Sequence, residues 1–187
     1  MSYKKQLIAA IERTRDNGIA VKDFVIESAS YPIVNAQNEM MLLESFNEHV
    51  YNKPFEEIHG QCVLHSWNLQ DIVADILNCD VLLTLGYLLN ELDKYFFTEE
   101  QQILQWKEMP SNLRRDIHAW LTLPSLEIID ITLPATLFKM NKSALDYRTF
   151  MHYRPDDHYG LTGRIYHTPQ FVDNDFLERV YLLKKLE

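Results

Sequence analysis

Hydrophobic residues recur every three or four positions in several stretches of the chain, which is the spacing of an amphipathic helix. Asn17-Gly18 favours the end of the first of these helices, because glycine tolerates the left-handed conformation that often closes a helix. A further short helix is expected within an otherwise irregular segment over 133–160, near 142–151. The pattern predicts the main helices over residues 3–16, 38–51, 62–78, 98–107 and 173–185.

Other stretches have the pattern of β-strands. Residues 80–89 (DVLLTLGYLL) form a continuous apolar run, which is typical of a buried strand. Residues 117–123 and 126–132 flank a Pro-Ser pair and predict a hairpin, and residues 164–167 predict a last short strand. Helices come first and a mostly antiparallel sheet follows, so the sequence predicts an α+β fold.

The domain organisation is expected to be simple. The chain has 187 residues, a length that suits one domain, and it contains no internal repeat or clear linker. We therefore expect a single domain over 1–187, with a core over about 38–135. The helix over 3–16 and the C-terminal segment 136–187 are expected to elaborate this core.

Charge and composition limit the partners and the cellular location that we expect for the protein. A net charge of −9 argues against nucleic acid or an anionic membrane as a partner. The sequence has neither an 18-residue apolar stretch nor the apolar region of a signal peptide. Its two cysteines, Cys62 and Cys79, are too few for a disulfide framework. A cytoplasmic location is therefore expected, and the oligomeric state stays open.

Two polar residues stand out in the predicted hairpin IHAWLTLPSLEIIDIT (117–132), namely His118 and Asp130. If the hairpin turns about Pro124, cross-strand partners have numbers that sum to 248, and His118 lies directly opposite Asp130. Trp120 and Ile128 then share the face of this pair. Two interpretations remain: a hydrogen bond that only satisfies two polar groups, or a catalytic base oriented by a carboxylate.

An oriented base needs a nucleophile, and the segment HGQCVLHSW (59–67) offers Cys62. Cys62 is expected at the start of a helix, where unpaired N–H groups and the helix dipole stabilise a thiolate and a developing oxyanion. Gly60 leaves room for a substrate backbone. The alternative interpretation is a small buried hydrophobe, which is the role expected for Cys79.

These three segments resemble the motifs of the transglutaminase-like branch of the papain-fold cysteine enzymes. Gly60-Gln61-Cys62 is similar to the Gly-Gln-Cys around the nucleophile of that family, and His118-Ala119-Trp120 is similar to its His-x-Trp. Asp130-Ile131-Thr132 is similar to its Asp-x-Thr strand, and the order of the motifs along the chain is the same. The resemblance implies a papain-like core, with the cysteine on a helix start packed on strands that carry His and Asp.

By this resemblance Cys62 is the nucleophile, His118 the general base and acid, and Asp130 the residue that orients His118. The implied function is acyl transfer through a thioester, acting on an amide or thioester of a protein, peptide or small molecule. Water or an amine would resolve the acyl-enzyme, so hydrolase and acyltransferase both stay open. No cofactor is expected. The candidates for an oxyanion donor or substrate wall are Gly60, Gln61, Trp67 and Trp120, and His59 is a further candidate donor.

Two other function classes stay open. One is a catalytically inactive interaction domain of the same fold. The other is a metal-binding protein, because His59, Cys62 and His65 are spaced three apart. Later histidines could complete such a site, namely His152, His158 and His167. The segment MHYRPDDHYG (151–160) is favoured as an exposed loop, although Arg154 within it could anchor a substrate.

Overall fold

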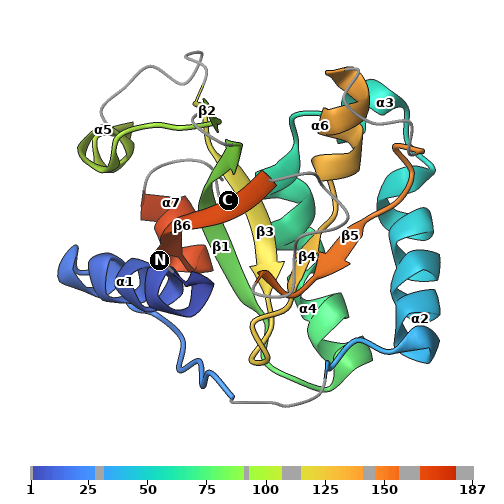
Figure 1. Ribbon diagram of the computed structural model, residues 1–187, viewed down its shortest axis with the longest axis horizontal. Helices are drawn as coiled ribbons and strands as arrows, with labels where there is room; N and C mark the ends of the chain where they lie inside the picture. The colour runs from blue at the N-terminus through green and yellow to red at the C-terminus, as the bar shows by residue number, and fades with distance from the viewer. Residues whose placement is uncertain are drawn as a thin grey trace. The chain divides into compact units, whose positions relative to one another are not determined.

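The computed structural model describes residues 2–27, 32–90, 93–106, 115–140, 146–155 and 165–179. Within these ranges the chain forms helices and antiparallel strands, so the predicted α+β class is confirmed (Figure 1). The chain divides into two compact units. Unit 1 comprises Met1–Asp23, Thr84–Ala119 and Pro155–Glu187, and unit 2 comprises Phe24–Leu83 and Trp120–Arg154. The single domain with a core over about 38–135 stays a prediction.

Unit 1 is built around the strand β1 (Leu82–Asn90), whose first two residues belong to unit 2. β1 pairs antiparallel with β2 (Asp93–Tyr95) on one side and with β6 (Ile165–Val172) on the other. The register of β1 and β6 shifts between Leu85 and Gly86. The predicted strand over 80–89 is confirmed, and β6 is longer than the predicted strand over 164–167.

Helix α1 (Tyr3–Asp16) packs against β6 in unit 1 and confirms the helix predicted over 3–16. The Thr14 hydroxyl donates to the carbonyl oxygen of Ala10 (2.8 Å) and accepts the N–H of Val172 (3.1 Å). The helix ends as the sequence predicts, with Gly18 at a φ of 71°. Its buried residues recur every three or four positions and form one face: Tyr3, Leu7, Ala10, Ile11 and Thr14.

Two short helices complete unit 1. They are α5 (Glu100–Leu104), which is shorter than the helix predicted over 98–107, and α7 (Asn174–Arg179). Residues 180–185 of the predicted C-terminal helix lie outside the described residues. The rings of Phe171 on β6 and Phe176 on α7 stack with centroids 4.3 Å apart, and this contact anchors α7 on the strand.

Four helical segments open unit 2. They are α2 (Ala36–Phe46), the π-helix η1 (Asn47–Tyr51), α3 (Phe55–Ile58) and α4 (Cys62–Leu77). The predicted helices over 38–51 and 62–78 are thereby confirmed. α2 begins with a capping box, in which Asn35 accepts the N–H of Asn38 while the Asn38 side chain accepts the N–H of Asn35. α2 and α4 pack against each other, and each carries a fully buried leucine, Leu42 on α2 and Leu69 on α4.

Three strands of unit 2 pair in the order β3 (His118–Thr122), β4 (Ile128–Asp130) and β5 (Met151–Tyr153), all antiparallel. The first two residues of β3 belong to unit 1. All residues of β3 and β4 are buried, so these strands have no solvated face. This burial explains the near-continuous apolar sequence of the hairpin.

The hairpin of β3 and β4 forms in a different register from the predicted one. Leu121 pairs with Ile129, so the numbers of cross-strand partners sum to 250 and not to 248. Continued along β4, this register places Trp120 opposite Asp130, where the prediction places His118. The predicted register is wrong by two residues.

The turn of the hairpin is the physical reason for this difference. The prediction centres the turn on Pro124, whereas the N–H of Leu123 donates to the carbonyl oxygen of Glu127 (2.9 Å), which centres the turn on Ser125. Leu126 adopts a φ of 68°, as the last residue of three-residue hairpin loops does. A leucine in the left-handed region is rare, and the loop lacks the glycine that usually marks this position. The position of the turn was therefore not evident from the sequence.

The prediction for residues 133–160 is also corrected. α6 (Leu133–Lys139) occupies the start of this segment, with Pro134 in its first turn, where proline costs no hydrogen bond. Residues 146–150 are not helical and β5 follows them, so no helix forms over 146–151. Residues 141–145 lie outside the described residues.

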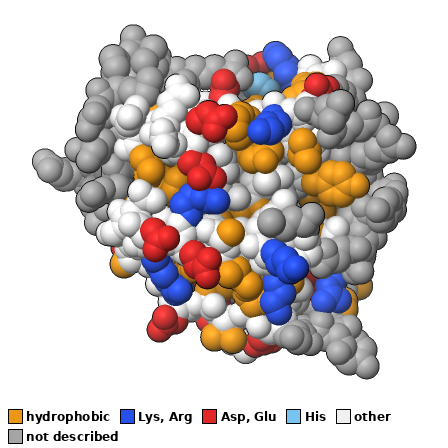
Figure 2. Space-filling model, turned by 60° about the vertical axis from the view of Figure 1, so that its left-hand side comes forward, with side chains coloured by type: hydrophobic (Ala, Val, Ile, Leu, Met, Phe, Trp, Pro, Cys, Tyr) orange, Lys and Arg blue, Asp and Glu red, His pale blue; other side chains and the backbone are white. Residues whose placement is uncertain are grey.

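None of the described helices is both long enough and apolar enough to cross a membrane. On the face of the molecule shown in Figure 2, acidic and basic side chains are interspersed, and neither sign gathers into one patch.

Candidate active site

Cys62 is the first residue of α4, and no side chain caps this helix. The side chain of the N-cap residue Gln61 makes no capping hydrogen bond, and the first turn contains no acidic residue. The N–H of His65 donates to the carbonyl oxygen of Gln61 (3.0 Å), the first hydrogen bond of the helix. The Cys62 sulfur therefore lies at the positive end of the dipole of a 16-residue helix, where proteins bind anions.

Gly60 forms the turn that leads into α4. Its φ of 77° lies in the left-handed region, which strains any residue with a side chain. A Cβ built at Gly60 would meet no atom within 4 Å. The requirement for glycine therefore comes from the backbone conformation, and the space beside Gly60 is open.

The two faces of α4 separate the candidate residues of this segment. Cys62 and His65 lie on the buried face, whereas Trp67 lies on the exposed face and is 43% exposed. The carbonyl oxygen of Glu57 accepts a hydrogen bond from Nε2 of His65 (2.9 Å). Burial lowers the pKa of His65, so this imidazole is neutral near neutral pH. Trp120, on β3, is fully buried.

Cys79 follows α4 and is half-buried. Burial, and then the carboxylates of Asp80, Glu127 and Glu27, raise the pKa of Cys79 to about 11. Cys79 is therefore a protonated thiol near neutral pH, and such a thiol is a poor nucleophile.

Asp130 ends β4 and is fully buried. Its Oδ1 accepts the backbone N–H groups of Thr132 (3.1 Å) and Leu133 (2.9 Å) at the start of α6. These two bonds fix the orientation of the carboxylate and supply a partner for N–H groups that a helix start leaves unpaired. Within unit 2, this part of the role of Asp130 is structural.

The pKa of Tyr51 is affected by the negative charge of Asp130. Burial first, and then the negative charge of Asp130, raise the pKa of Tyr51 far above its ordinary range. The hydroxyl therefore stays protonated, and it donates to the carbonyl oxygens of Ile131 (3.0 Å) and Thr149 (2.6 Å). Tyr51 thus ties η1 to the segment after β4.

His118 is described with unit 1, where its side chain is buried. The ring of Phe96 stacks on the imidazole, with centroids 5.4 Å apart and planes 25° apart. The ring of His167 lies beside it at 5.8 Å, tilted by 41°. These contacts hold the plane of the His118 ring within unit 1.

The predicted triad is thus divided between the two units. Cys62 and Asp130 belong to unit 2, and His118 belongs to unit 1. Each residue has its own surroundings: Cys62 opens a helix, Asp130 accepts two backbone hydrogen bonds, and His118 contacts two rings. Their combination into one site stays a prediction.

The spacing that suggested a metal site has another explanation in unit 2. Nε2 of His65 is bound to the Glu57 carbonyl oxygen, and the ring of His59 stacks on Phe55 at 5.4 Å. Within the described parts of unit 2, His59, Cys62 and His65 do not converge as ligands of one ion. His158 lies outside the described residues.

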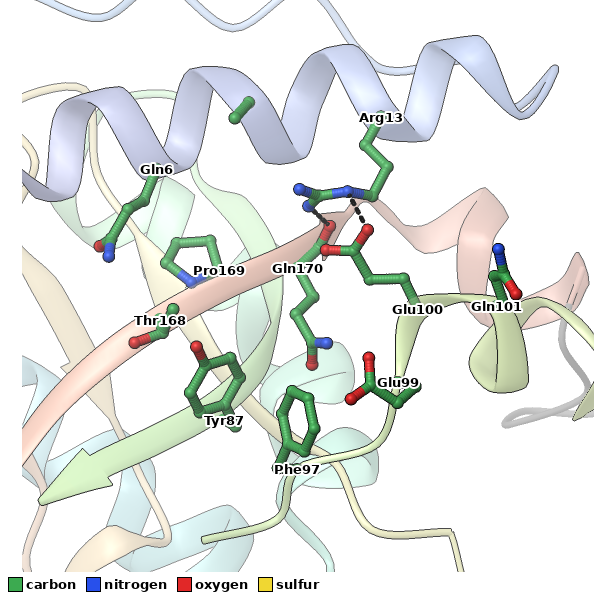
Figure 3. Close-up of a pocket in the computed structure, with 11 residues that line it drawn as sticks. Gln6, Arg13, Tyr87, Phe97, Glu99, Glu100, Gln101, Thr168, Pro169 and Gln170 are labelled. Carbon is green, nitrogen blue, oxygen red and sulfur yellow. Dashed lines mark hydrogen bonds and ion pairs between the residues drawn. The ribbon is translucent and has the colours of Figure 1, made fainter. Parts of the chain in front are cut away.

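A cavity of about 730 Å³ lies in unit 1, a volume typical of small-molecule sites (Figure 3). No candidate residue named from the sequence lines it. Its walls come from α1, β1, β6 and the segment that leads into α5. The lining residues are Gln6, Ala9, Arg13, Tyr87, Phe97, Glu99, Glu100, Gln101, Thr168, Pro169 and Gln170.

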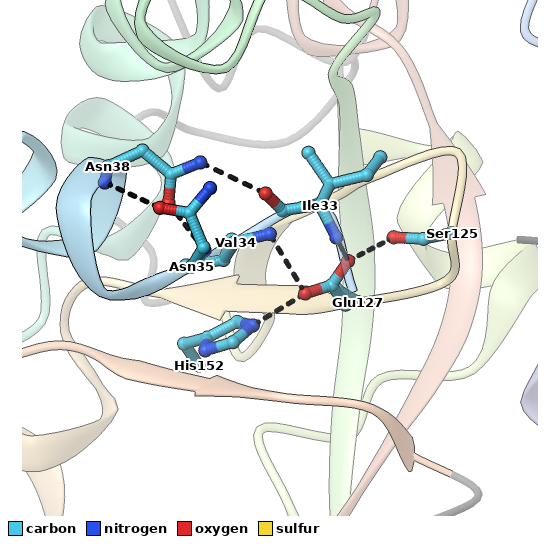
Figure 4. Close-up of polar contacts among 7 residues, drawn as sticks. All are labelled: Ile33, Val34, Asn35, Asn38, Ser125, Glu127 and His152. Carbon is cyan, nitrogen blue, oxygen red and sulfur yellow. Dashed lines mark hydrogen bonds and ion pairs between the residues drawn. The ribbon is translucent and has the colours of Figure 1, made fainter. Parts of the chain in front are cut away.

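Glu127 is a buried residue that the sequence interpretation passed over (Figure 4). It accepts the N–H groups of Ile33 (2.6 Å) and Val34 (3.2 Å), the Ser125 hydroxyl, and Nε2 of His152 (2.8 Å). Glu127 stands in the apolar run SLEIIDI (125–131). The argument used for Asp130, that a buried polar group needs a partner, applies equally to Glu127. We name these five residues the Glu127 cluster.

In comparisons with known proteins, no family model matches the chain, and no curated protein or solved structure matches it either.

Proposed function

We propose that the protein is a cysteine-dependent acyl-transfer enzyme in which Cys62 is the nucleophile, His118 the general base and acid, and Asp130 the residue that orients His118. The observation that carries the proposal is the position of Cys62, which opens the uncapped helix α4 directly after the left-handed Gly60. A helix start supplies N–H groups that stabilise both a thiolate and an oxyanion. The three sequence motifs support the assignment of the two partners.

The reaction proceeds in two steps. The Cys62 sulfur attacks an amide or thioester carbonyl, a carbon–sulfur bond forms, and the bond to the leaving group breaks. The leaving group takes a proton from His118. Water or an amine then attacks the thioester, gives up its proton to His118, and releases Cys62 as a thiolate.

A cytoplasmic setting belongs to this proposal. Neither Cys62 nor Cys79 forms a disulfide, and a thiol nucleophile needs a reducing environment to stay reduced. The substrate class is an amide or thioester of a protein or peptide.

The test is the rate at which iodoacetamide alkylates Cys62 at pH 7, measured in a Cys79→Ser background by mass spectrometry. We expect replacement of His118 by Asn to slow alkylation about tenfold or more, because the general base is lost. The matched control is His49→Asn, an exposed histidine on η1, which should leave the rate unchanged. Thermal unfolding of each variant establishes that it is folded.

A second measurement separates catalysis from mere reactivity. Incubation with a peptide thioester should load an acyl group onto Cys62 and not onto Cys62→Ser, and a chelator should not change the rate. If folded parent protein reacts only after denaturant is added, Cys62 is a core thiol and the proposal fails. The protein would then be interpreted as a catalytically inactive interaction domain of the same fold.

A further inference from the structure

The cavity in unit 1 has charges of both signs, but its positive charge is already paired. Nε of Arg13 on α1 forms an ion pair with Glu100 (2.7 Å), and Nη1 donates to the carbonyl oxygen of Gln170 (2.6 Å). The guanidinium also lies 5.9 Å from the centre of the Phe171 ring. Arg13 is thus held in the wall by contacts within the protein, and its charge is balanced by that of Glu100.

Glu99 is different from Glu100. It precedes α5 and lines the cavity, yet among the described residues its carboxylate makes no ion pair or hydrogen bond. Arg13 and Glu100 form a pair, so Glu99 gives the residues that line the cavity a net charge of −1. The lining therefore favours a cation as an ionic ligand.

Gln170 adds an unmet hydrogen-bonding group. Its side chain is 3% exposed, and its Nε2 donates to the carbonyl oxygen of Thr98 (2.9 Å), which fixes the orientation of the amide. The other amide atom, Oε1, is buried without a hydrogen-bond partner. Figure 3 shows this amide extending from β6 toward the part of the cavity where Phe97 and Glu99 lie. A buried acceptor without a partner needs an explanation, and a donor bound in the adjoining cavity would supply one.

Aromatic rings form the adjoining wall and already attract one cation. Tyr87 and Phe97 meet edge to face, with centroids 5.0 Å apart. The ammonium nitrogen of Lys94 lies 3.8 Å from the centre of the Phe97 ring and 5.4 Å from that of Tyr87. Lys94 is not among the residues that line the cavity. Its ammonium group therefore contacts the two rings without being part of the cavity wall.

We propose that this cavity is a binding site for a primary alkylammonium group. The ammonium donates to Oε1 of Gln170 and to the carboxylate of Glu99, and the alkyl chain lies against Phe97 and Tyr87. The site lies within unit 1, and the ammonium is bound without reacting. The proposal therefore does not depend on the acyl-transfer function.

The probe for the test is n-butylammonium, and n-butanol is its neutral match in size. Amide proton–nitrogen correlation spectra of the full chain follow both titrations at constant ionic strength. We expect butylammonium to shift the amides of Phe97–Gln101 and Thr168–Gln170 saturably in the millimolar range, and butanol to leave them unchanged. Such a weak affinity is appropriate for a ligand with few atoms.

Variants locate the site. Glu99→Gln and Gln170→Leu should each weaken butylammonium binding about tenfold, because each removes one acceptor of the ammonium. The matched control is Glu12→Gln, which removes the same charge from an exposed position of α1 that does not line the cavity. Its effect should stay within about twofold, as expected for a screened surface charge.

Three results would overturn the proposal. Equal binding of butanol would make the cavity an apolar pocket without selectivity for cations. A loss with Glu12→Gln as large as that with Glu99→Gln would mean general attraction to an acidic chain. An absence of saturable shifts in the parent protein would mean that the cavity holds only water.

Discussion

The Glu127 cluster of unit 2 and the cavity in unit 1, which Gln170 lines, each include a buried hydrogen-bond acceptor. The two acceptors differ in the number of hydrogen bonds that they accept. The Glu127 carboxylate accepts hydrogen bonds from two backbone N–H groups, a hydroxyl and an imidazole. Oε1 of Gln170 accepts none. The Glu127 side chain is fully enclosed by protein, whereas Gln170 adjoins a cavity of about 730 Å³.

The difference distinguishes a structural site from a binding site. The four donors of the Glu127 cluster come from the segment before α2, the hairpin turn and β5, so the carboxylate joins three parts of unit 2 (Figure 4). The carboxylate of such a network is already hydrogen-bonded within the protein, so the network stabilises the fold and does not bind a ligand. An unmet acceptor beside a cavity has the opposite character, because it gains a partner only when something binds.

The largest expected effect is the loss of the Glu127 carboxylate. Glu127→Leu removes the acceptor of four donors, of which those of Val34 and Ser125 are buried and those of Ile33 and His152 partly buried. It should therefore lower the free energy of unfolding by about 3–5 kcal/mol. Urea denaturation at pH 7 measures this change. Glu44→Leu, at an exposed position of α2, is the control, and it should change stability by less than about 0.5 kcal/mol. Equal effects of the two variants would contradict the structural role.

A smaller effect is expected from acid. Burial by itself raises the pKa of Glu127, but hydrogen bonds from His152, Ser125, Ile33 and Val34 outweigh burial and lower it below the ordinary 4.5. The stabilisation by the carboxylate is therefore complete above the unfolded-state pKa and is lost as the pH falls through the folded-state pKa.

The stability difference between the parent protein and Glu127→Gln measures this loss. It should shrink when urea denaturation is repeated from about pH 6 down to about pH 3. A difference that stays constant over this range would mean that the charge of Glu127 does not contribute to stability.

The smallest expected effect is that of Gln170→Leu on stability. The change removes the hydrogen bond to Thr98 but also removes an unmet acceptor, so the two effects oppose each other. The free energy of unfolding should change by less than about 1 kcal/mol. A loss comparable to that of Glu127→Leu in the same urea assay would show that Gln170 is as structural as Glu127, and would remove the contrast between the two regions.

Elements with strong periodicity could be predicted from the sequence. The spacing of buried residues located α1 and α4 almost to the residue, and the apolar run located β1. The register of the hairpin could not be predicted, because it depends on a leucine, Leu126, in a conformation that favours glycine. α6 was missed because residues 133–160 were expected to be largely irregular, although Pro134 is well suited to a first helical turn.

Single residues of the candidate site were predicted unevenly. The position of Cys62 at a helix start followed from local pattern. The hydrogen bonds of Asp130 to the start of α6 did not, because that helix itself was not expected. The Glu127 cluster needs the N–H groups of Ile33 and Val34, which lie 94 and 93 residues away, and no local pattern contains such a contact.

The packing of α1 on β6 has a consequence for the order in which the chain folds. The N–H of Val172 reaches the hydroxyl of Thr14 across 158 residues of sequence. A ribosome releases α1 long before β6, so the apolar face of this helix stays without its native partner while the residues between Thr14 and Val172 are made. Synthesis at about 5–20 residues per second makes that wait many seconds long. The packing of α1 on β6 in unit 1 therefore forms only after translation has passed Val172, and the apolar face of α1 lacks this partner until then.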